Sequence, residues 1–542
     1  METAIGIDLG TSYSTVAAVV DGKPQVLADD EGMEVQPSIV AFLEGGEILV
    51  GRSAKTQLSI DPFNTIYSAK RLIGRRVDDP DAHIAINNLP YSVVPGPNEH
   101  PVIRVRGERV SIPEVSAYVL RLMKKIAERR LGLPVDKAVI TVPANFNDAQ
   151  RESTRIAGRI AGLDVIRIIN EPTAAALAYG YGRGLDRLIA LYDFGGGTFD
   201  FTLLEVQGLV FRVISTAGDM FLGGDDFDDA LAHAVANSFW KQTGIELQKN
   251  VVEWQRVLLA CESCKRALSQ ETAAPLHVER IAHTAEGVLD LSADITRDLF
   301  NSLCFDLVRR SFAVCERALA DAKVRPEDID DVIMVGGSTY IPLVGASVEQ
   351  FFSKEPRGGV SPETAVALGA AIQAYSLMAA PSPQPEDDRT VLLDVLPHSI
   401  GIVAAGGVVE RVLKRNVSIP VEQSRLFSTS RDNQTELRIR IVQGEAPRAN
   451  ENTALGELII DGLRAATRGT VEVLVTFEVD TNGILNVTAR DRDSGRIYKK
   501  SVKVSGELDD QEIARASRRQ YASEGSKEPA SEGPASRDPR ER

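Results

Sequence analysis

The chain has few cysteines, few tryptophans and no long run of apolar residues. Four cysteines and two tryptophans occur among 542 residues, and 76 acidic against 61 basic residues give a net charge of −15. So few cysteines argue against a disulfide-stapled fold. No apolar run reaches the roughly 20 residues that span a bilayer. The acidic balance disfavours nonspecific binding to nucleic acid or to anionic membranes, so we expect neither partner.

The first ten residues, METAIGIDLG, lack the basic stretch and apolar core of a secretory signal. We therefore expect a cytoplasmic protein.

Cys261 and Cys264 form a C-x-x-C motif inside a stretch with helical character. One such pair is weak evidence for zinc, because a structural zinc site needs four ligands. Two reduced cysteines on a helix are the expected state.

The chain is longer than one hydrophobic core supports, so more than one domain is expected. The pattern of apolar residues divides it into regions. In residues 1–380, short apolar runs alternate with helical stretches, which predicts an α/β domain. Proline and acidic residues then mark a linker. Period-two alternation follows, with Asn482-Gly483 and Ser494-Gly495 where hairpin turns belong. The expected organisation is an α/β domain over 1–380, a linker over 381–394, an all-β domain over 395–505, a short helix over 506–522 and a disordered tail over 523–542.

Two stretches share an unusual pattern. GIDLGTSYST at 6–15 and LYDFGGGTFD at 191–200 each have an apolar entry, one Asp, one apolar residue, and then glycine and hydroxyl residues. Glycine-rich turns expose backbone N–H groups that bind phosphate. Asp8 and Asp193 would repel phosphate unless a hydrated Mg²⁺ lay between. We interpret the pair as two hairpins that grip a polyphosphate in the cleft of a duplicated domain. The alternative is two ordinary glycine hairpins; the P-loop pattern GxxxxGK[ST] is absent.

Seven motifs, in order, resemble one known family. They are IGIDLGTSYSTVA, NTIYSAKRLIGRR, VITVPANFNDAQR, IINEPTAAALAYG, YDFGGGTFD, GDMFLGGDDFD and VGGSTYIP. Together they make the chain similar to the DnaK-type heat-shock chaperones over about residues 4–505, with a wider fold that resembles actin and the sugar kinases. The resemblance implies a duplicated α/β, actin-like (ribonuclease-H-like) ATPase domain, a linker, and an all-β sandwich that binds extended peptides.

The resemblance also implies roles for single residues. Lys70 and Glu171 match residues that position the attacking water, and Thr198 and Asp200 match residues of the loop beside the γ-phosphate. The two hairpin aspartates match residues that hold Mg²⁺ through water, with K⁺ as a further candidate cation. Without the resemblance, Lys70 would be interpreted as a solvated helix cation and Glu171 as an acid favoured by a helix N-terminus. The residues expected to bind ATP or ADP are Gly10, Thr11, Ser12, Tyr13, Gly195, Gly196, Gly197, Thr198, Gly224, Glu262, Lys265, Arg266, Ser269, Gly336, Gly337, Ser338 and Tyr340.

Two departures from the family pattern bear on ATP binding and on communication between the domains. Tyr340 stands where the family usually has an arginine that stacks on adenine, so the affinity for ATP is expected to differ. Asn145 stands where the family usually has a tyrosine, in a region that relays the nucleotide state to the other domain. Three residues of that region, Pro143, Arg151 and Arg167, do match the family. Hydrolysis is therefore expected, with altered coupling.

The stretch TVLLDV at 390–395 resembles the apolar linker that docks on the ATPase domain, with one leucine fewer. Leu392, Leu393 and Asp394 are its expected coupling residues. The alternative interpretation is that this stretch forms the first strand of the β domain. If it docks, a charged substitution in it should uncouple the two domains, because a charge is costly on an apolar surface.

In the β domain, Ile402, Phe427 and Ile439 match apolar positions of the peptide channel. Leu437 occupies the central pocket position, where the family often has the smaller valine. Ala405 and Ser430 replace the pair that arches over bound peptide. After the sandwich only residues 506–522 have helical character, and one short helix cannot form a bundle over the peptide site. A lidless member of the family is therefore expected.

The expected function is an ATP-dependent chaperone that hydrolyses ATP and binds unfolded or extended client peptides. The resemblance implies a J-domain co-chaperone and a nucleotide-exchange factor as partners. One alternative is an ATP-sensing regulatory protein of the same fold with weak client coupling. A small-molecule kinase of the sugar-kinase class is a further alternative, opposed by the C-terminal β domain, which such a kinase does not need.

Overall fold

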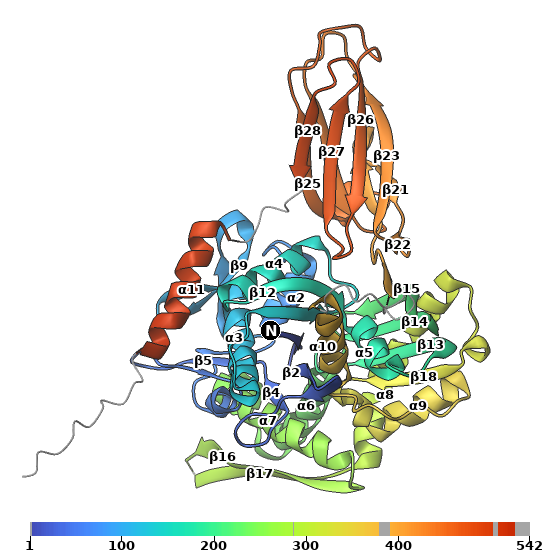
Figure 1. Ribbon diagram of the computed structural model, residues 1–542. Helices are drawn as coiled ribbons and strands as arrows, with labels where there is room; N and C mark the ends of the chain where they lie inside the picture. Colours follow the sequence, from blue (N-terminus) through green and yellow to red (C-terminus); the bar gives the residue numbers. More distant parts are fainter. Residues whose placement is uncertain (1–2, 286, 379–390, 502–507, 526–542) are drawn as a thin grey trace, which may run out of the picture.

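The computed structural model describes residues 3–285, 287–378, 391–501 and 508–525. Figure 1 shows a large α/β body and a β-sandwich that stands on it. Alternating strands and helices build the body, whereas strands alone build the sandwich. The arrangement confirms the predicted fold class, a duplicated α/β domain joined to an all-β sandwich.

The first half of the body is organised around a central hairpin. β1 (Ala4–Leu9) pairs antiparallel with β2 (Tyr13–Val20) and parallel with β11 (Lys137–Val142). The hairpin turn therefore lies at the carboxyl edge of the parallel strands, where ligands bind in open α/β sheets. The remaining elements of this half are β3 (Lys23–Val26), β4 (Val35–Pro37), β5 (Val40–Phe42), β6 (Ile48–Val50), β7 (Thr65–Ile66), β8 (Ser92–Pro95), β9 (Pro101–Val105), β10 (Glu108–Ser111), β12 (Asp164–Asn170), α1 (Arg52–Lys55), α2 (Pro80–Asn87), α3 (Ile112–Leu131), α4 (Asp148–Ile160) and α5 (Glu171–Gly180).

The second half repeats this pattern. β13 (Leu185–Phe194) pairs antiparallel with β14 (Phe199–Gly208) and parallel with β18 (Asp331–Val335). The same hairpin thus occupies the same place in a second sheet, which is the duplication that the sequence predicts. The other elements are β15 (Val210–Asp219), β16 (Ala273–Thr284), β17 (Gly287–Thr296), α6 (Gly224–Thr243), α7 (Val251–Leu268), α8 (Arg297–Ala322) and α9 (Pro342–Phe352).

A helix of small side chains packs between the two halves. α10 (Ala365–Met378) packs against β1 and α5 of the first half and shares a buried core with β13 and β18 of the second half. Figure 1 shows α10 beside α5. Ala367 and Ala371 are fully buried against Ala17. Small residues let the helix and the sheet approach closely, so the two hairpin turns are held at a fixed separation.

The sandwich consists of two facing antiparallel sheets, with orders β21-β20-β24-β25 and β23-β26-β27-β28. Its core contains Ile441, Phe477 and Val487, all fully buried. Tight turns follow at 480–484 and 491–496, where the sequence predicts them. The strands of these sheets are β20 (Ile400–Val403), β21 (Val409–Leu413), β23 (Val421–Ser428), β24 (Leu437–Gln443), β25 (Thr453–Ile460), β26 (Glu472–Val479), β27 (Leu485–Asp491) and β28 (Ile497–Ser501), and the short β22 (Ser418–Ile419) between β21 and β23 lies outside both sheets.

One strand belongs to both bodies. β19 (Val391–Val395) extends the second sheet of the α/β body by pairing parallel with β15, and it also pairs antiparallel with β22 of the sandwich. Val395 is buried in the core of the body, whereas the next residue, Leu396, is buried in the core of the sandwich. The part of the expected linker that the structure describes is therefore a strand. Residues 379–390 lie outside the described residues.

Polar contacts fix the sandwich on the body. The buried carboxylate of Asp148, on α4, accepts the backbone N–H of Leu485 at 2.8 Å. Burial raises the pKa of Asp148 to about 6, which the Leu485 N–H opposes. Arg415 forms an ion pair with Asp321 at 2.6 Å. The start of β27 and the turn before β22 thus both touch the body.

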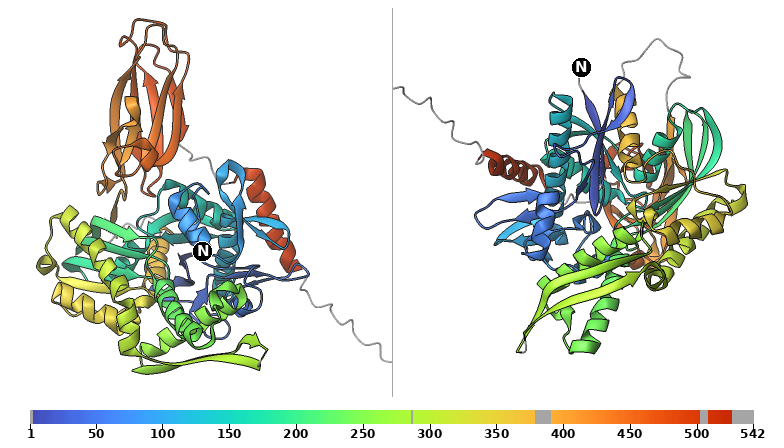
Figure 2. Two further views of the ribbon diagram at one scale, coloured as in Figure 1. Left: turned by 180° about the vertical axis from the view of Figure 1, so that it is seen from behind. Right: turned by 90° about the horizontal axis from the view of Figure 1, so that it is seen from below.

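The last described helix lies against the α/β body and not on the sandwich. α11 (Asp510–Gly525) buries Ile513 and Ala516 in the core of the first half. Arg519 pairs with Glu114 of α3 at 2.5 Å, and Arg159 of α4 pairs with Asp510 at 2.9 Å. Figures 1 and 2 show α11 beside the body, away from the sandwich.

The predicted helix over 506–522 is therefore shifted, and the prediction of disorder is wrong for 523–525, which belong to α11. The reason lies in tertiary packing. The apolar face of the helix is buried against the α/β body, and this contact stabilises a longer helix than the local sequence predicts. Residues 526–542 and the start of the expected helix, 506–507, lie outside the described residues.

We expect Ile513→Asp to release α11 from the body, because an unpaired carboxylate in this core costs several kcal/mol. Backbone hydrogen exchange in α11, measured by mass spectrometry, should accelerate at least about tenfold. Ala514→Asp is the matched control, since residue 514 is exposed on the same helix. Equal protection in both variants would mean that the buried face does not hold α11.

Candidate functional site

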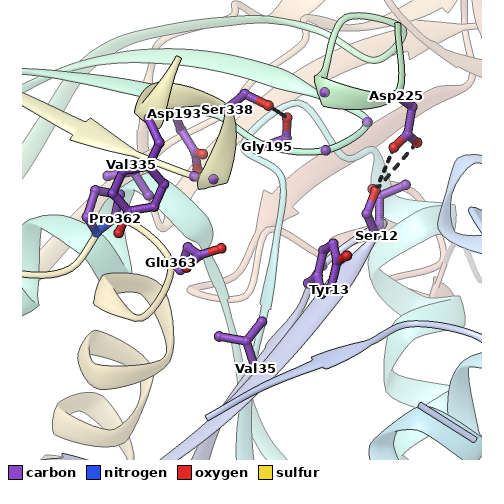
Figure 3. Close-up of a pocket in the computed structure, with 18 of the residues that line it drawn as sticks. Ser12, Tyr13, Val35, Asp193, Gly195, Asp225, Val335, Ser338, Pro362 and Glu363 are labelled. Atoms are coloured by element: carbon purple, nitrogen blue, oxygen red, sulfur yellow. Dashed lines mark hydrogen bonds between the residues drawn. The ribbon is translucent and has the colours of Figure 1, made fainter. Parts of the chain in front are cut away.

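The two glycine-rich turns face each other across a cleft. Figure 3 shows Ser12 of the first turn and Gly195 of the second turn, both of which line it. A Cβ atom added to Gly196 would lie 2.2 Å from the Ser12 Oγ, and one added to Gly223 would lie 2.4 Å from the carbonyl oxygen of Gly196. Only glycine permits this approach. The Ser12 hydroxyl donates to Asp225 at 3.2 Å, which joins the first hairpin to the start of α6 in the second half.

The turns enclose a cavity of about 580 Å³. This volume suits a nucleotide-sized ligand. All of the residues expected to bind ATP line it, together with both metal candidates, Asp8 and Asp193. The expected residues on its wall are Asp8, Gly10, Thr11, Ser12, Tyr13, Glu171, Asp193, Gly195, Gly196, Gly197, Thr198, Gly224, Glu262, Lys265, Arg266, Ser269, Gly336, Gly337, Ser338 and Tyr340.

Lys70 and Asp200 are absent from this wall and lie directly behind it. The Lys70 side chain is only 5 % exposed, and its Nζ donates to the Glu171 Oε1 at 2.7 Å and to the carbonyl oxygen of Leu9. The interpretation of Lys70 as a solvated helix cation is therefore wrong. Glu171 is the first residue of α5, so the helix N-terminus also favours its charge.

Buried carboxylates surround this one lysine. Burial raises the pKa of Asp8 to about 7, and the charge of Glu171 adds to the shift. The pKa of Asp193 is raised well above its ordinary value for the same two reasons, and that of Asp200 rises to about 7. The Asp8 carboxylate accepts the Thr141 hydroxyl at 3.0 Å. Lys70 lowers all three pKa values but does not balance four acids, so a further cation would be stabilised here.

The donor chemistry fits a hydrated Mg²⁺. Asp8 and Asp193 both line the cavity, one from each hairpin. Within the described residues, no group of three or more Asp, Glu, His or Cys side chains is arranged to hold a metal ion directly. Two carboxylates acting through water match the way Mg²⁺ is usually bound, since it keeps several of its own waters.

The far wall of the cavity is formed by α7. The Tyr13 hydroxyl donates to the Glu262 Oε1 at 2.5 Å, and Lys55 binds the other oxygen at 2.7 Å. The guanidinium of Arg266 lies over the Tyr13 ring, 4.9 Å from its centroid. Lys265 donates to the carbonyl oxygen of Gly224 at 2.8 Å. Side chains from both halves thus close this end of the cleft.

Several lining or bridging residues are missing from the sequence-based set. Lys55 bridges the two halves, Asp225 binds Ser12, and Asp228 pairs with Lys265 at 2.7 Å. Glu363 lines the cavity beside Gly337. The acids of α6 follow Gly223-Gly224 in the motif GDMFLGGDDFD, so that motif could have indicated them. Nothing local marks Lys55, whose partner is distant in the sequence.

The cysteines of the C-x-x-C motif do not form a reactive pair. All four cysteines are buried and free. Burial raises the pKa of Cys264 to about 11, and burial also raises that of Cys261. Neither therefore has the low pKa of a reactive thiol.

The expected coupling residues lie between the cavity and the sandwich. The buried Arg151 donates to the Asn170 Oδ1 at 2.6 Å, and the Asn170 amide donates to Asp394 of β19 at 2.7 Å. Burial lowers the pKa of Arg167, which the charge of Asp394 opposes. The Pro143 carbonyl accepts the Phe146 N–H at 3.1 Å. Leu392 packs on the core of the body, whereas Leu393 is partly buried beside it.

The expected peptide-binding residues lie in the sandwich, far from the cavity. Ile402 and Ile439 are buried in its core, and Phe427 and Leu437 are partly buried against the same core. Ser430 is exposed just after β23. The side chain of Ala405 lies outside the described residues.

The geometry agrees with a comparison against families of known proteins. The model of the family described as "Hsp70 protein" matches residues 4–537, nearly the whole chain. Members of this family are nucleotide-binding chaperones with ATPase activity. None of the described helices is long and apolar enough to cross a membrane. With two facing glycine hairpins, a buried Lys70–Glu171 pair and a β-sandwich joined by a docked strand, the chain belongs to the Hsp70 family.

Proposed function

We propose that this chain hydrolyses ATP to ADP and phosphate and binds extended segments of unfolded proteins in its sandwich. The observation that carries the proposal is the buried Lys70–Glu171 pair, placed behind two facing hairpins whose turns leave room for a phosphate chain. Phosphoryl transfer needs positioning and charge stabilisation more than covalent chemistry. A fixed lysine and a fixed carboxylate beside the phosphate end would supply both.

In this proposal each group has a defined task. The backbone N–H groups of residues 10–12 and 196–198 bind the phosphates, as glycine-rich turns do. Glu171 and Thr198 line the cavity and orient the attacking water. Lys70, held by Glu171, stabilises the charge that develops at the transferred group. Mg²⁺ held through water by Asp8 and Asp193 would neutralise phosphate charge.

The nucleoside end is assigned to the opposite wall. Glu262, Lys265, Arg266 and Ser269 of α7 and the loop of residues 336–340 line it. Tyr340 is 47 % exposed, so its ring is available to stack on adenine. Further proposals are a J-domain co-chaperone and a nucleotide-exchange factor as partners, K⁺ as a second cation, and a cytoplasmic site of action.

For the peptide site we propose capture of an extended segment by main-chain hydrogen bonds and an apolar pocket, a known mode of recognition. Leu437 and Phe427, partly buried on the sandwich core, form the apolar surface. α11 is docked on the α/β body through Ile513 and Ala516, so in this arrangement it does not cover the sandwich. We therefore propose that no helix of the described chain acts as a lid.

Lys70→Ala should abolish hydrolysis while ATP still binds, because Lys70 lies behind the cavity wall and acts on the reacting group. Single-turnover hydrolysis and the equilibrium Kd for ATP measure the two effects separately. Arg266→Ala is the matched control: it removes a cation from the nucleoside wall and should weaken ATP binding with little change in the hydrolysis step. Unchanged hydrolysis in Lys70→Ala would remove the lysine from the mechanism.

Replacing both Leu392 and Leu393 with Asp should uncouple peptide binding from the ATPase rate. Leu392 packs on the core of the body, and a carboxylate there would undock β19. The measurement is stimulation of ATP hydrolysis by a model peptide. Val391→Asp serves as the control, since Val391 is 42 % exposed in the same strand. Equal stimulation in the double variant and the wild type would exclude this role for the strand.

Peptide release should be fast in both nucleotide states, because binding differences among related complexes lie mainly in the off-rate and a closing lid would act there. Leu437→Val should enlarge the pocket and tighten a leucine-containing peptide by about 1 kcal/mol, roughly fivefold in affinity. Stopped-flow release of a fluorescent peptide measures both. Release over many minutes from the ADP state would show that another element traps the peptide.

A further inference from the structure

A second cavity lies beside the one assigned to ATP. Its volume is about 510 Å³, and residues from both halves of the body line it. Ser12 and Asp225 are among the residues that line both cavities. The Ser12 hydroxyl lies 3.2 and 3.4 Å from the two Asp225 oxygens, as the dashed lines of Figure 3 show. Next to the phosphate-binding turns, the two cavities are therefore separated by one hydrogen-bonded pair of side chains.

The nucleotide cavity is closed at its phosphate end. Glu171 and Asp193 are buried there, whereas Tyr340 at the nucleoside end is exposed. Once ATP is cleaved, ADP would still fill the space between the two ends. The phosphate product then lies on the buried side of ADP. It must either wait for ADP to leave or take a second way out.

Two side chains from the same short segment as Lys70 lie at the inner end of the second cavity. Ser68 and Arg71 both line it. The Ser68 hydroxyl donates to the Asp225 Oδ2 at 3.4 Å, and the Arg71 Nη2 lies 3.8 Å from the same oxygen. Arg71 also donates to the carbonyl oxygen of Gly197 at 3.1 Å. It therefore contacts the second phosphate-binding turn and the second cavity at once.

Arg71 has unused capacity to bind an anion. Its side chain is 13 % exposed, and its Nε has no hydrogen-bond partner within the described residues. The carboxylates of Asp225 and Asp226 are each 3.8 Å from its Nη2, which is longer than a charge-assisted hydrogen bond. A guanidinium with a free N–H matches the geometry of phosphate oxygens. Because two acids compete for this cation, a phosphate would be held only weakly and would pass on.

The other end of the second cavity reaches solvent. Asn88, which follows α2, and Gln248, which precedes α7, line it from the two halves. Both residues are exposed. Between the two ends the wall includes the acids Asp228 and Asp229, which oppose retention of an anion. The cavity therefore leads from the buried phosphate end of the nucleotide cavity to the surface.

We propose that the second cavity is the exit route of the phosphate product, with Ser68 and Arg71 as a transient anion site at its inner end. Opening of the Ser12–Asp225 pair joins the two cavities. Arg71 then draws the phosphate away from the turn of Gly197, and the acidic wall prevents its retention. The inference rests on the proposed function, because it needs ATP to be hydrolysed. It adds the step that follows hydrolysis and separates the path of phosphate from that of ADP.

The test blocks the outer end of the cavity in the full chain. Asn88→Cys is labelled with a bulky maleimide and compared with the same protein before labelling. The four native cysteines are buried, and burial raises the pKa of each, so they resist the reagent. Ile84→Cys with the same label is the matched control, since residue 84 is 50 % exposed on α2 and does not line the cavity.

In a single turnover, acid quench measures hydrolysis, and a fluorescent phosphate sensor measures release. The label at residue 88 should slow phosphate release at least about fivefold, with hydrolysis and ADP release changed less than about twofold. The label at residue 84 should change none of the three rates. If Asn88→Cys does not fold, Gln248→Cys carries the label on the wall that the second half supplies.

Two variants of Arg71 test the anion site itself. Arg71→Met should slow phosphate release about threefold, because Asp225 and Asp226 would then face the phosphate without a cation. Arg71→Lys keeps the charge and should release phosphate within about twofold of the wild-type rate. Release from Arg71→Met at the wild-type rate overturns the anion site.

The outcomes separate the exit route from the proposed function. A labelled Asn88→Cys chain that hydrolyses ATP and releases phosphate without delay overturns the route and leaves the proposed function intact. A label that slows the release of phosphate and ADP equally also overturns it, since both products then share one opening. A wild-type chain that binds ATP but never hydrolyses it overturns the proposed function and the inference together.

Discussion

The structure depends on the burial of one lysine among four carboxylates. Lys70 is held by Glu171 at 2.7 Å, and Asp8, Asp193 and Asp200 all have raised pKa values because burial disfavours their charge. Taking such charges out of water is costly unless neighbouring groups compensate them. The duplicated sheets supply the rigidity, since each hairpin is central in its own sheet. This electrostatic shortfall is the reason why we propose a hydrated Mg²⁺ with the nucleotide in this cleft.

The sandwich is attached to the α/β body through a shared strand. β19 adds a strand to the sheet that carries the second hairpin, and buried side chains pass from one core to the other at Val395 and Leu396. The sandwich therefore contacts a sheet edge and the loop of Asn145. Asn145 also donates to Asp200 at 2.6 Å, so a single residue separates the sandwich from this buried acid.

Much of this followed from the sequence. The repeated Asp-x-Gly pattern predicts two hairpins with phosphate-binding turns, because glycine frequency and the apolar period of a strand are local properties. The Asn482-Gly483 and Ser494-Gly495 turns predict the sandwich hairpins for the same reason. The fold class could therefore be predicted from the sequence, and the structure and the family confirm it. Most residues that line the cavity belong to motifs short enough to be recognised.

The sequence by itself thus determined most of the elements that form and where the two glycine-rich turns lie. Tertiary structure decided the rest, because it depends on contacts between residues far apart in the chain. Only the fold buries Lys70, brings Lys55 across to Glu262, and seats α11 on α3 and α4 in place of a free end. Only the fold puts His398 against Asn145. No local period encodes such pairs; they arise when apolar faces pack and leave each polar group its one available partner.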